Sequence, residues 1–93
     1  MNGHRTAELR SIALHCAIAE RLDAKVVARA RVRLASHQGA YRDRWLALLD
    51  RSIEEVAAAL VRDDDEMRAM RQATPFTFVI DSRERWRIWR ATG

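Results

Sequence analysis

The chain contains a single proline, Pro75, and only three glycines, while its apolar residues recur mainly at the spacing of helices. Proline disfavours the helical conformation of the residue before it, so a helix must stop before Pro75. The short segment "PFTFVI" that follows reads as an extended linker or a lone strand. We therefore expect an all-α fold, a small bundle of about five short helices with an extended linker before the C-terminal helix.

The apolar periodicity places the first three helices at about residues 6–22, 24–37 and 41–49. Thr6 and Asp23 are residue types that accept hydrogen bonds from free N–H groups at the start of a helix, so they are expected N-caps. Gly39 is the expected residue at the C-terminal end of the second helix, because glycine adopts the left-handed conformation common there.

Ser52 and Glu55 have the spacing of a capping box, in which each side chain binds the other's free backbone N–H, and they mark the start of a fourth helix. The acidic residues 63–66 are expected at the start of a fifth, where the helix dipole favours negative charge. Met67 and Met70 should face inward. After the linker, Asp81 can begin a last helix that runs to about residue 90.

The first expected helix has apolar residues on two sides. One stripe consists of Leu9, Ile12, Ala13 and Cys16, and the other of Leu14, Ile18 and Leu22. A helix of this kind is either central in its own bundle or keeps one side for another chain.

Composition predicts a single helical domain over residues 1–93 with a thin core. Apolar residues make up 48% of the chain, but sixteen of them are alanine. A chain of this size buries a modest share of its surface, so completing the core by dimerisation or docking is expected. The single cysteine excludes an internal disulfide and favours a reducing cytoplasm. No apolar stretch is long enough for a signal peptide or a membrane span, so a cytoplasmic protein without a membrane partner is expected.

Charge is unevenly distributed along the chain. Residues 1–49 carry nine basic and four acidic side chains (net +5), residues 50–66 carry two and seven (net −5), and residues 67–93 carry six and two (net +4). Basic ends of this kind could bind a polyanion, so operator DNA or RNA is one candidate partner. Sixteen arginines against one lysine also fit an ordinary surface encoded by a GC-rich genome.

No pattern of metal-binding or catalytic residues emerges. His15 and Cys16 are adjacent, so on a helix they point in different directions, and His4 and His37 belong to separate segments. No glycine-rich phosphate loop is present, and the cluster at 63–66 has a structural explanation. We therefore expect no enzyme activity, no metal and no cofactor, and interpret His15 as a hydrogen-bonding residue at a surface or interface.

Residues 71–90 hold four of the six aromatic side chains and the proline. In the last expected helix Arg83, Arg87 and Arg90 form a stripe, with Trp86 and Trp89 beside it. Two interpretations remain open. The tryptophans close the protein's own core beneath solvated arginines, or residues 73–93 form a docking arm, since Trp and Arg dominate the energetics of interfaces.

"SIALHCAIAERL" and "RQATPFTFVIDSRERWRIWR" resemble a family of small, arginine-rich helical proteins of actinobacteria. The family pattern has Ser-Leu-Ala-Leu-His-Arg early and Arg-Gln-x-Ser-Pro-Phe-Ala-Gly-Val-Leu, then Glu-Arg, late. The matching positions are Ser11, Leu14, His15, Arg71, Gln72, Pro75, Phe76, Val79, Glu84 and Arg85. Cys16 stands where the pattern has arginine, and Phe78 where it has glycine. Because phenylalanine disfavours the backbone conformations open to glycine, we expect the linker here either to follow a different path or to dock its partner differently.

The resemblance implies a bacterial antitoxin that binds and inhibits a nucleotidyltransferase-like toxin by covering its active site. Together, the resemblance and the last helix predict these partner-binding residues: His15, Arg71, Gln72, Pro75, Phe76, Phe78, Arg83, Trp86, Arg87, Trp89 and Arg90. The alternatives are a small basic DNA- or RNA-binding regulator and a self-associating helical protein that forms a homodimer.

Overall fold

The computed structural model describes residues 3–92, with side chains from residue 5 onward, and this part of the chain contains no strand. Its elements are α1 (Gly3–Glu20), α2 (Ala24–Ala35), α3 (Arg42–Leu49), α4 (Ile53–Leu60), α5 (Asp65–Gln72), the short 3-10 helix η1 (Thr77–Val79) and α6 (Ser82–Thr92). The all-α expectation is confirmed. None of these helices combines the length and apolar character that crossing a bilayer requires.

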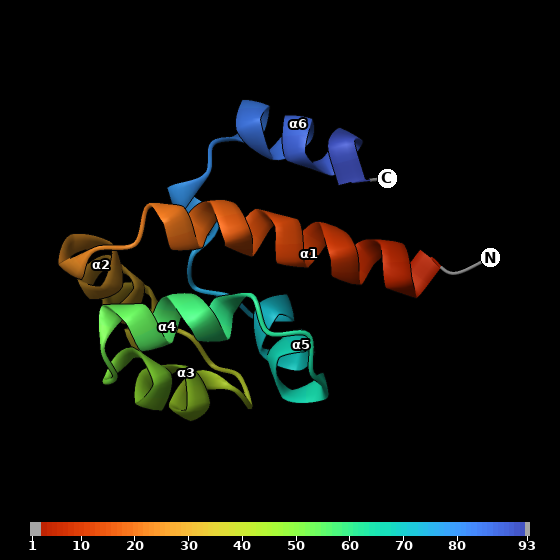
Figure 1. Ribbon diagram of the computed structural model, residues 1–93. Coiled ribbons are helices and arrows are strands. Elements are labelled where there is room, and N and C mark those ends of the chain that lie inside the picture. Colours follow the sequence, from red (N-terminus) through yellow and green to blue (C-terminus); the bar gives the residue numbers. More distant parts are fainter. Residues whose placement is uncertain (1–2, 93) are drawn as a thin grey trace.

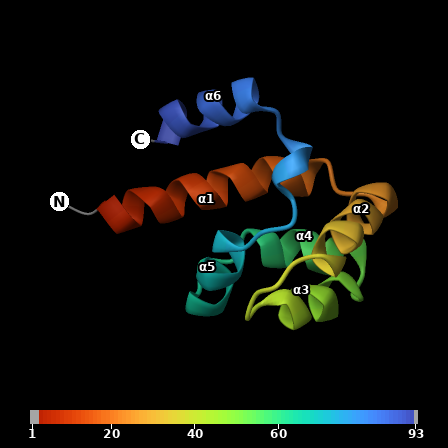
Figure 2. The ribbon, with the colours of Figure 1, turned by 180° about the vertical axis from the view of Figure 1, so that it is seen from behind.

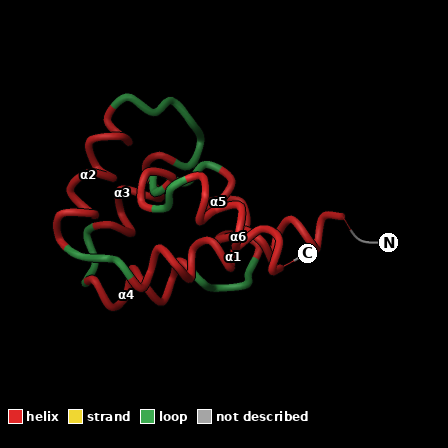
Figure 3. Tube along the Cα trace, turned by 90° about the horizontal axis from the view of Figure 1, so that it is seen from above, coloured by secondary structure: helices red, strands yellow, loops and turns green. Residues whose placement is uncertain are grey.

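Helix α1 runs through the middle of the molecule (Figure 1). Helix α6 lies on one side of it, and α4 and α5 lie on the other, an arrangement that the opposite view repeats (Figure 2). Viewed from above, α6 lies along α1, and the two helices run antiparallel (Figures 1 and 3). Because α3–α5 gather on the far side of α1, the main helical neighbour of α6 among residues 3–92 is α1.

The predicted starts at Asp23 and Asp81 are confirmed, and Asp64 is the N-cap among the acidic residues 63–66 expected at the start of the fifth helix. Asp23, Asp64 and Asp81 each accept a hydrogen bond from the backbone N–H three residues later, at 2.8, 2.9 and 2.8 Å. Ser52 accepts one from the N–H of Glu55 at 3.1 Å. This bond is one of the two expected in a capping box. The Ser52 hydroxyl also donates to the Glu55 carboxylate at 3.1 Å.

Two predicted helix boundaries are wrong. Helix α1 begins at Gly3, so Thr6 lies within it rather than capping it. Helix α2 ends at Ala35, and its C-terminal backbone is closed by the N–H of Ser36, which donates to the Leu34 carbonyl. Gly39 lies beyond that end and does not have the left-handed conformation expected of a glycine cap.

The centre of the core is a pair of aromatic rings, Trp45 of α3 and Phe76, whose centroids are 5.8 Å apart at an interplanar angle of 70°. Both side chains are fully buried. The Trp45 indole N–H donates to the Met70 carbonyl at 3.0 Å, which satisfies its only polar atom. Met67 and Met70 are buried as predicted.

The expected extended linker is not present. Pro75 and Phe76 are buried, and the chain then forms η1 rather than a strand. The Thr74 hydroxyl accepts a hydrogen bond from the Phe76 N–H at 3.2 Å, which turns the chain at the proline and brings Phe76 onto Trp45. Residues 74–80 therefore belong to the folded core, because Ile80 at their end is also buried.

Both expectations for the first helix hold in part. Ile18 is buried, and Leu14 and Leu22 pack against the core, so their stripe faces inward. On the other stripe, Leu9 and Cys16 are exposed. Helix α1 is thus central in its own bundle and still leaves part of its second stripe open.

Candidate functional site: the outer face of the C-terminal helix

Helix α6 has an inner side and an outer side. On the inner side, Arg85, Ile88 and Thr92 are half-buried, and Ile88 packs against the core. On the outer side, Arg83, Trp86, Arg87 and Arg90 are exposed. These four residues have the spacing i, i+3, i+4, i+7 of one helical face, and we call them the outer face of α6.

The two tryptophans of α6 lie outside the core. The exposed fractions are 59% for Trp86 and 44% for Trp89, whereas that of Trp45 is 0%. Trp86 lies on the outer face of α6. Trp89 lies at its edge, where the Arg10 guanidinium of α1 is 4.7 Å from its ring centroid. The interpretation in which Trp86 and Trp89 close the core is therefore wrong, because Trp45 and Phe76 occupy that place.

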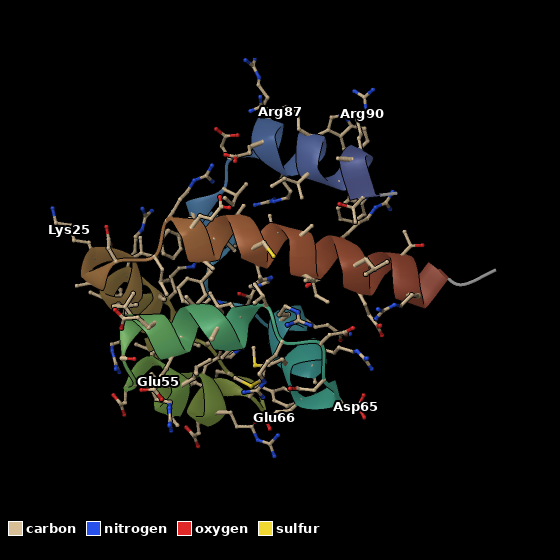
Figure 4. All side chains as sticks on the ribbon, viewed as in Figure 1. Lys25, Glu55, Asp65, Glu66, Arg87 and Arg90 are labelled. Carbon is tan, nitrogen blue, oxygen red and sulfur yellow. The ribbon has the colours of Figure 1, made fainter. Side chains whose placement is uncertain are left out.

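The three arginines of the outer face are not paired within the described residues. No carboxylate of residues 5–92 forms an ion pair with Arg83, Arg87 or Arg90. Figure 4 shows the labelled Arg87 and Arg90 pointing away from α1. Their full positive charge is consequently available to a molecule that approaches this face.

Arg85 has a different role from its neighbours. Its Nη2 donates to the Thr77 carbonyl at 3.0 Å and to the Ile80 carbonyl at 3.3 Å. At the same end of α6, Arg21 pairs with Glu84, and further along the helix the Arg10 Nε donates to the Trp89 carbonyl at 3.1 Å. These contacts hold α6 in one orientation on α1.

His15 was expected to form hydrogen bonds at a surface or interface; it forms hydrogen bonds, but the expected location is wrong because its side chain is buried. Its Nδ1 is 2.8 Å from the Ser11 carbonyl and its Nε2 is 2.9 Å from the Thr74 hydroxyl. A carbonyl can only accept, so Nδ1 carries the proton and Nε2 accepts from Thr74. Burial lowers the pKa of His15 to about 4, and the nearby positive charge of Arg71 contributes to this shift.

Arg71 was also predicted to bind a partner, but its side chain is buried. Its Nη1 donates to the carbonyls of Leu60 and Arg62 at 3.2 and 2.7 Å. Arg71 therefore places positive charge at the C-terminal end of α4, where the helix dipole favours it. Burial lowers its pKa, although Asp63 and Asp64 partly offset this effect.

The remaining predicted site residues divide between core and surface. Pro75 and Phe76 are buried, so they are not available to a partner. Gln72 is exposed. Phe78 is half-buried, and the guanidinium groups of Arg29 and Arg33 lie 4.5 and 5.5 Å from its ring centroid.

The acidic segment 50–66 is largely paired within the molecule. Asp63 binds Arg5 and Arg68, both at 3.1 Å, and hydrogen bonds from these two arginines hold its pKa below the usual range. Arg31, Arg51 and Arg62 form ion pairs with other carboxylates of the segment. Figure 4 shows Glu55, Asp65 and Glu66 on the side of the molecule opposite Arg87 and Arg90.

Within residues 5–92 no three side chains of the metal-binding types come together, and the side chain of His4 lies outside the described residues. A cleft that the sequence did not indicate lies between α1 and α6, with a volume of about 170 Å³. Its residues come from three separate segments, so no local pattern could have revealed it.

Searches against protein-family models, curated proteins and solved structures gave no match to this chain.

Proposed function

We propose that this chain is a protein-interaction module, and that the outer face of α6 docks on an acidic surface of a protein partner that also offers an apolar contact. The observation that carries this proposal is Trp86, which is 59% exposed between three arginines that form no ion pair with the carboxylates of residues 5–92. A chain with few bulky side chains keeps one of its largest outside the core, and exposed apolar surface of this kind is typical of interaction sites.

The chemistry of this face fits binding to a protein. Tryptophan and arginine are the residue types most enriched where binding energy concentrates, and removing one such side chain typically costs about 2 kcal/mol or more. Arg83, Arg87 and Arg90 can each bind a carboxylate through two parallel N–H groups. Because Ile88 and Arg85 already hold α6 in place, docking costs little ordering of the helix.

We propose more specifically that the partner is a nucleotidyltransferase-like toxin and that binding of this chain inhibits it. The support is the family resemblance in residues 11–15 and 71–85. Sites that use Mg²⁺ with nucleotides hold the metal by one or two carboxylates. The arginines of the outer face of α6 can pair with such carboxylates, while the helix itself blocks access of nucleotide and RNA.

The acidic segment 50–66 has little part in this proposal. Its carboxylates mostly bind arginines of the same chain, so breaking those pairs would offset much of the gain from a basic partner. Positive charge on α6 therefore sets the preference for an acidic partner surface.

The test is co-expression with the product of the adjacent gene, which the family resemblance implies is a nucleotidyltransferase-like protein. We expect the two proteins to copurify, and we expect growth arrest caused by the neighbouring protein alone to be relieved. Absence of a complex at micromolar concentrations, together with unrelieved arrest, would contradict the finer proposal. A matched control is the same experiment with a nucleotidyltransferase from an unrelated locus.

Nucleic-acid binding is the second candidate, and the observation in its favour is the same stripe of unpaired arginines. Binding to duplex DNA should weaken with salt with a log–log slope of about −0.9 per phosphate contacted. It should depend on Arg87 and Arg90 far more than on Trp86. A salt-insensitive or undetectable interaction with DNA and RNA would exclude this candidate and leave the protein partner.

A further inference from the structure

The cleft between α1 and α6 is distinct from the outer face of α6, because it lies against the inner side of that helix. Its volume is about 170 Å³. Leu14, Ile88 and Trp89 supply apolar walls, and His15, Arg71 and Thr74 lie among its polar lining residues. A cavity of about 150 Å³ with apolar walls is large enough for one benzene ring.

Most polar groups around this cleft already have partners. Both ring nitrogens of His15 are hydrogen-bonded, and the Thr74 hydroxyl lies between His15 and the Phe76 N–H. Arg10 and Arg85, which also line the cleft, donate to backbone carbonyls. None of these recorded contacts identifies a ligand.

Arg71 differs from the other lining residues. Its side chain is 3% exposed, and its Nη1 binds two carbonyls, but its Nε and Nη2 have no hydrogen-bond partner among the described residues. A buried donor without a partner is costly, and more so in a charged group. Nε and Nη2 form one edge of the guanidinium, and this edge can bind a carboxylate by two parallel N–H···O bonds.

We propose that the cleft binds a small organic acid, in which a carboxylate pairs with the Nε and Nη2 of Arg71 and an apolar ring or short chain lies against Leu14, Ile88 and Trp89. A carboxylate fits this edge better than a phosphate does. A phosphate brings more charge and more acceptor atoms than one guanidinium edge can satisfy between apolar walls.

Binding requires the groups around Arg71 to move, because Nε and Nη2 are enclosed. Among the walls of the cleft, helix α6 has no fully buried residue among those described, so we expect α6 to shift when a ligand enters. Trp89 lines the cleft, so its fluorescence should report the event. A ligand that moves α6 would also alter the outer face, but binding in the cleft does not depend on the proposed partner.

The test uses benzoate as the probe, on the purified full chain. We expect benzoate to raise the Tm, to change the tryptophan fluorescence, and to bind with a Kd of about 1 mM or lower, as befits a ligand of this size. Benzamide, which has the same ring without the negative charge, should bind at least about tenfold more weakly. Inorganic phosphate should leave the Tm unchanged at the same ionic strength.

Two variants test whether benzoate binds in this cleft, and a third serves as the control. Arg71→Lys keeps the charge but lacks the two-donor edge, so benzoate binding should weaken by about tenfold or more. Ile88→Phe fills the cleft from the α6 side and should also weaken binding, while Val32→Phe on the exposed face of α2 should not. Equal binding of benzoate and benzamide, tighter binding of phosphate, or no binding of benzoate to the folded protein would each overturn the proposal.

Discussion

The Nε2 of His15 in α1 lies 2.9 Å from the hydroxyl of Thr74, which is 59 residues later in the chain. The Thr74 hydroxyl in turn accepts from the Phe76 N–H at 3.2 Å. One neutral imidazole therefore ties the central helix to the turn that carries Phe76 into the core. The connection depends on Nε2 remaining an acceptor, which links the fold to pH.

Stability should decrease as the pH falls below about 6.5. The pKa of His15 is lowered from 6.5 to about 4 by burial, so between these values the unfolded chain binds more protons than the folded one. The contribution of His15 to the free energy of unfolding is complete above pH 6.5 and is lost by about pH 4. It amounts to roughly 3 kcal/mol for a pKa shift of this size. Urea unfolding at several pH values measures it.

The matched variant is His15→Asn, which keeps an amide donor for the Ser11 carbonyl. It should unfold more easily than the parent at pH 7 but show a smaller loss of stability between pH 6.5 and 4. If the parent and the variant lose the same free energy over that interval, another group is responsible for the pH dependence.

The same substitution at two tryptophans should have opposite consequences. Trp45→Phe removes buried volume and the hydrogen bond to the Met70 carbonyl, so it should lower the free energy of unfolding by about 1–3 kcal/mol. Trp86→Phe changes an exposed ring and should alter the free energy of unfolding by no more than about 0.5 kcal/mol. Chemical denaturation of both variants compares them, and a large loss for Trp86→Phe would mean that its ring supports the fold.

Two neighbouring arginines of α5 should also differ. Arg71→Gln leaves the carbonyls of Leu60 and Arg62 without their charged donor and should destabilise the protein by about 1–3 kcal/mol. Arg68→Gln removes ion pairs that are open to solvent and should cost less than about 1 kcal/mol. Similar losses of unfolding free energy in the two variants would indicate that the buried hydrogen bonds of Arg71 contribute little to stability.

Partner binding should depend on where positive charge is removed. Arg87→Glu reverses a charge on the outer face of α6 and should weaken the complex with an acidic partner by about tenfold or more. Arg42→Glu on α3 makes the same change on another element and should alter the Kd by less than about threefold. Calorimetry at low and moderate salt measures both, and the parent should bind more weakly as salt increases.

The local signals in the sequence predicted the helices well. Asp23, Ser52, Asp64 and Asp81 act within three residues of themselves, so their effect does not depend on the rest of the fold. Helical spacing likewise identified the inward positions of Met67 and Met70. The apolar periodicity and the caps together sufficed for the all-α class.

Apart from the helix boundaries at Thr6 and Gly39, the errors arose where distant segments meet. His15 lies on the polar side of α1 by sequence, but α5 and the turn after it cover that side. Phe76 follows a proline and reads as linker, yet its ring fills the space beside Trp45. Burial of Arg71 depends on the carbonyls of α4, which no pattern near Arg71 reveals. That the residues of the outer face of α6 share one side of a helix could be predicted because they all lie within that helix.

The central claim is that Trp86, on the outer face of α6, serves a partner and not the fold. A single comparison tests it. The affinity for the product of the adjacent gene is measured with Trp86→Ala and with the control Val32→Ala, and circular dichroism and Tm are recorded on the same samples. We expect Trp86→Ala to keep its helicity and to bind at least about tenfold more weakly, and the control to bind like the parent. Collapse of the fold in Trp86→Ala, or an unchanged affinity, would contradict the account.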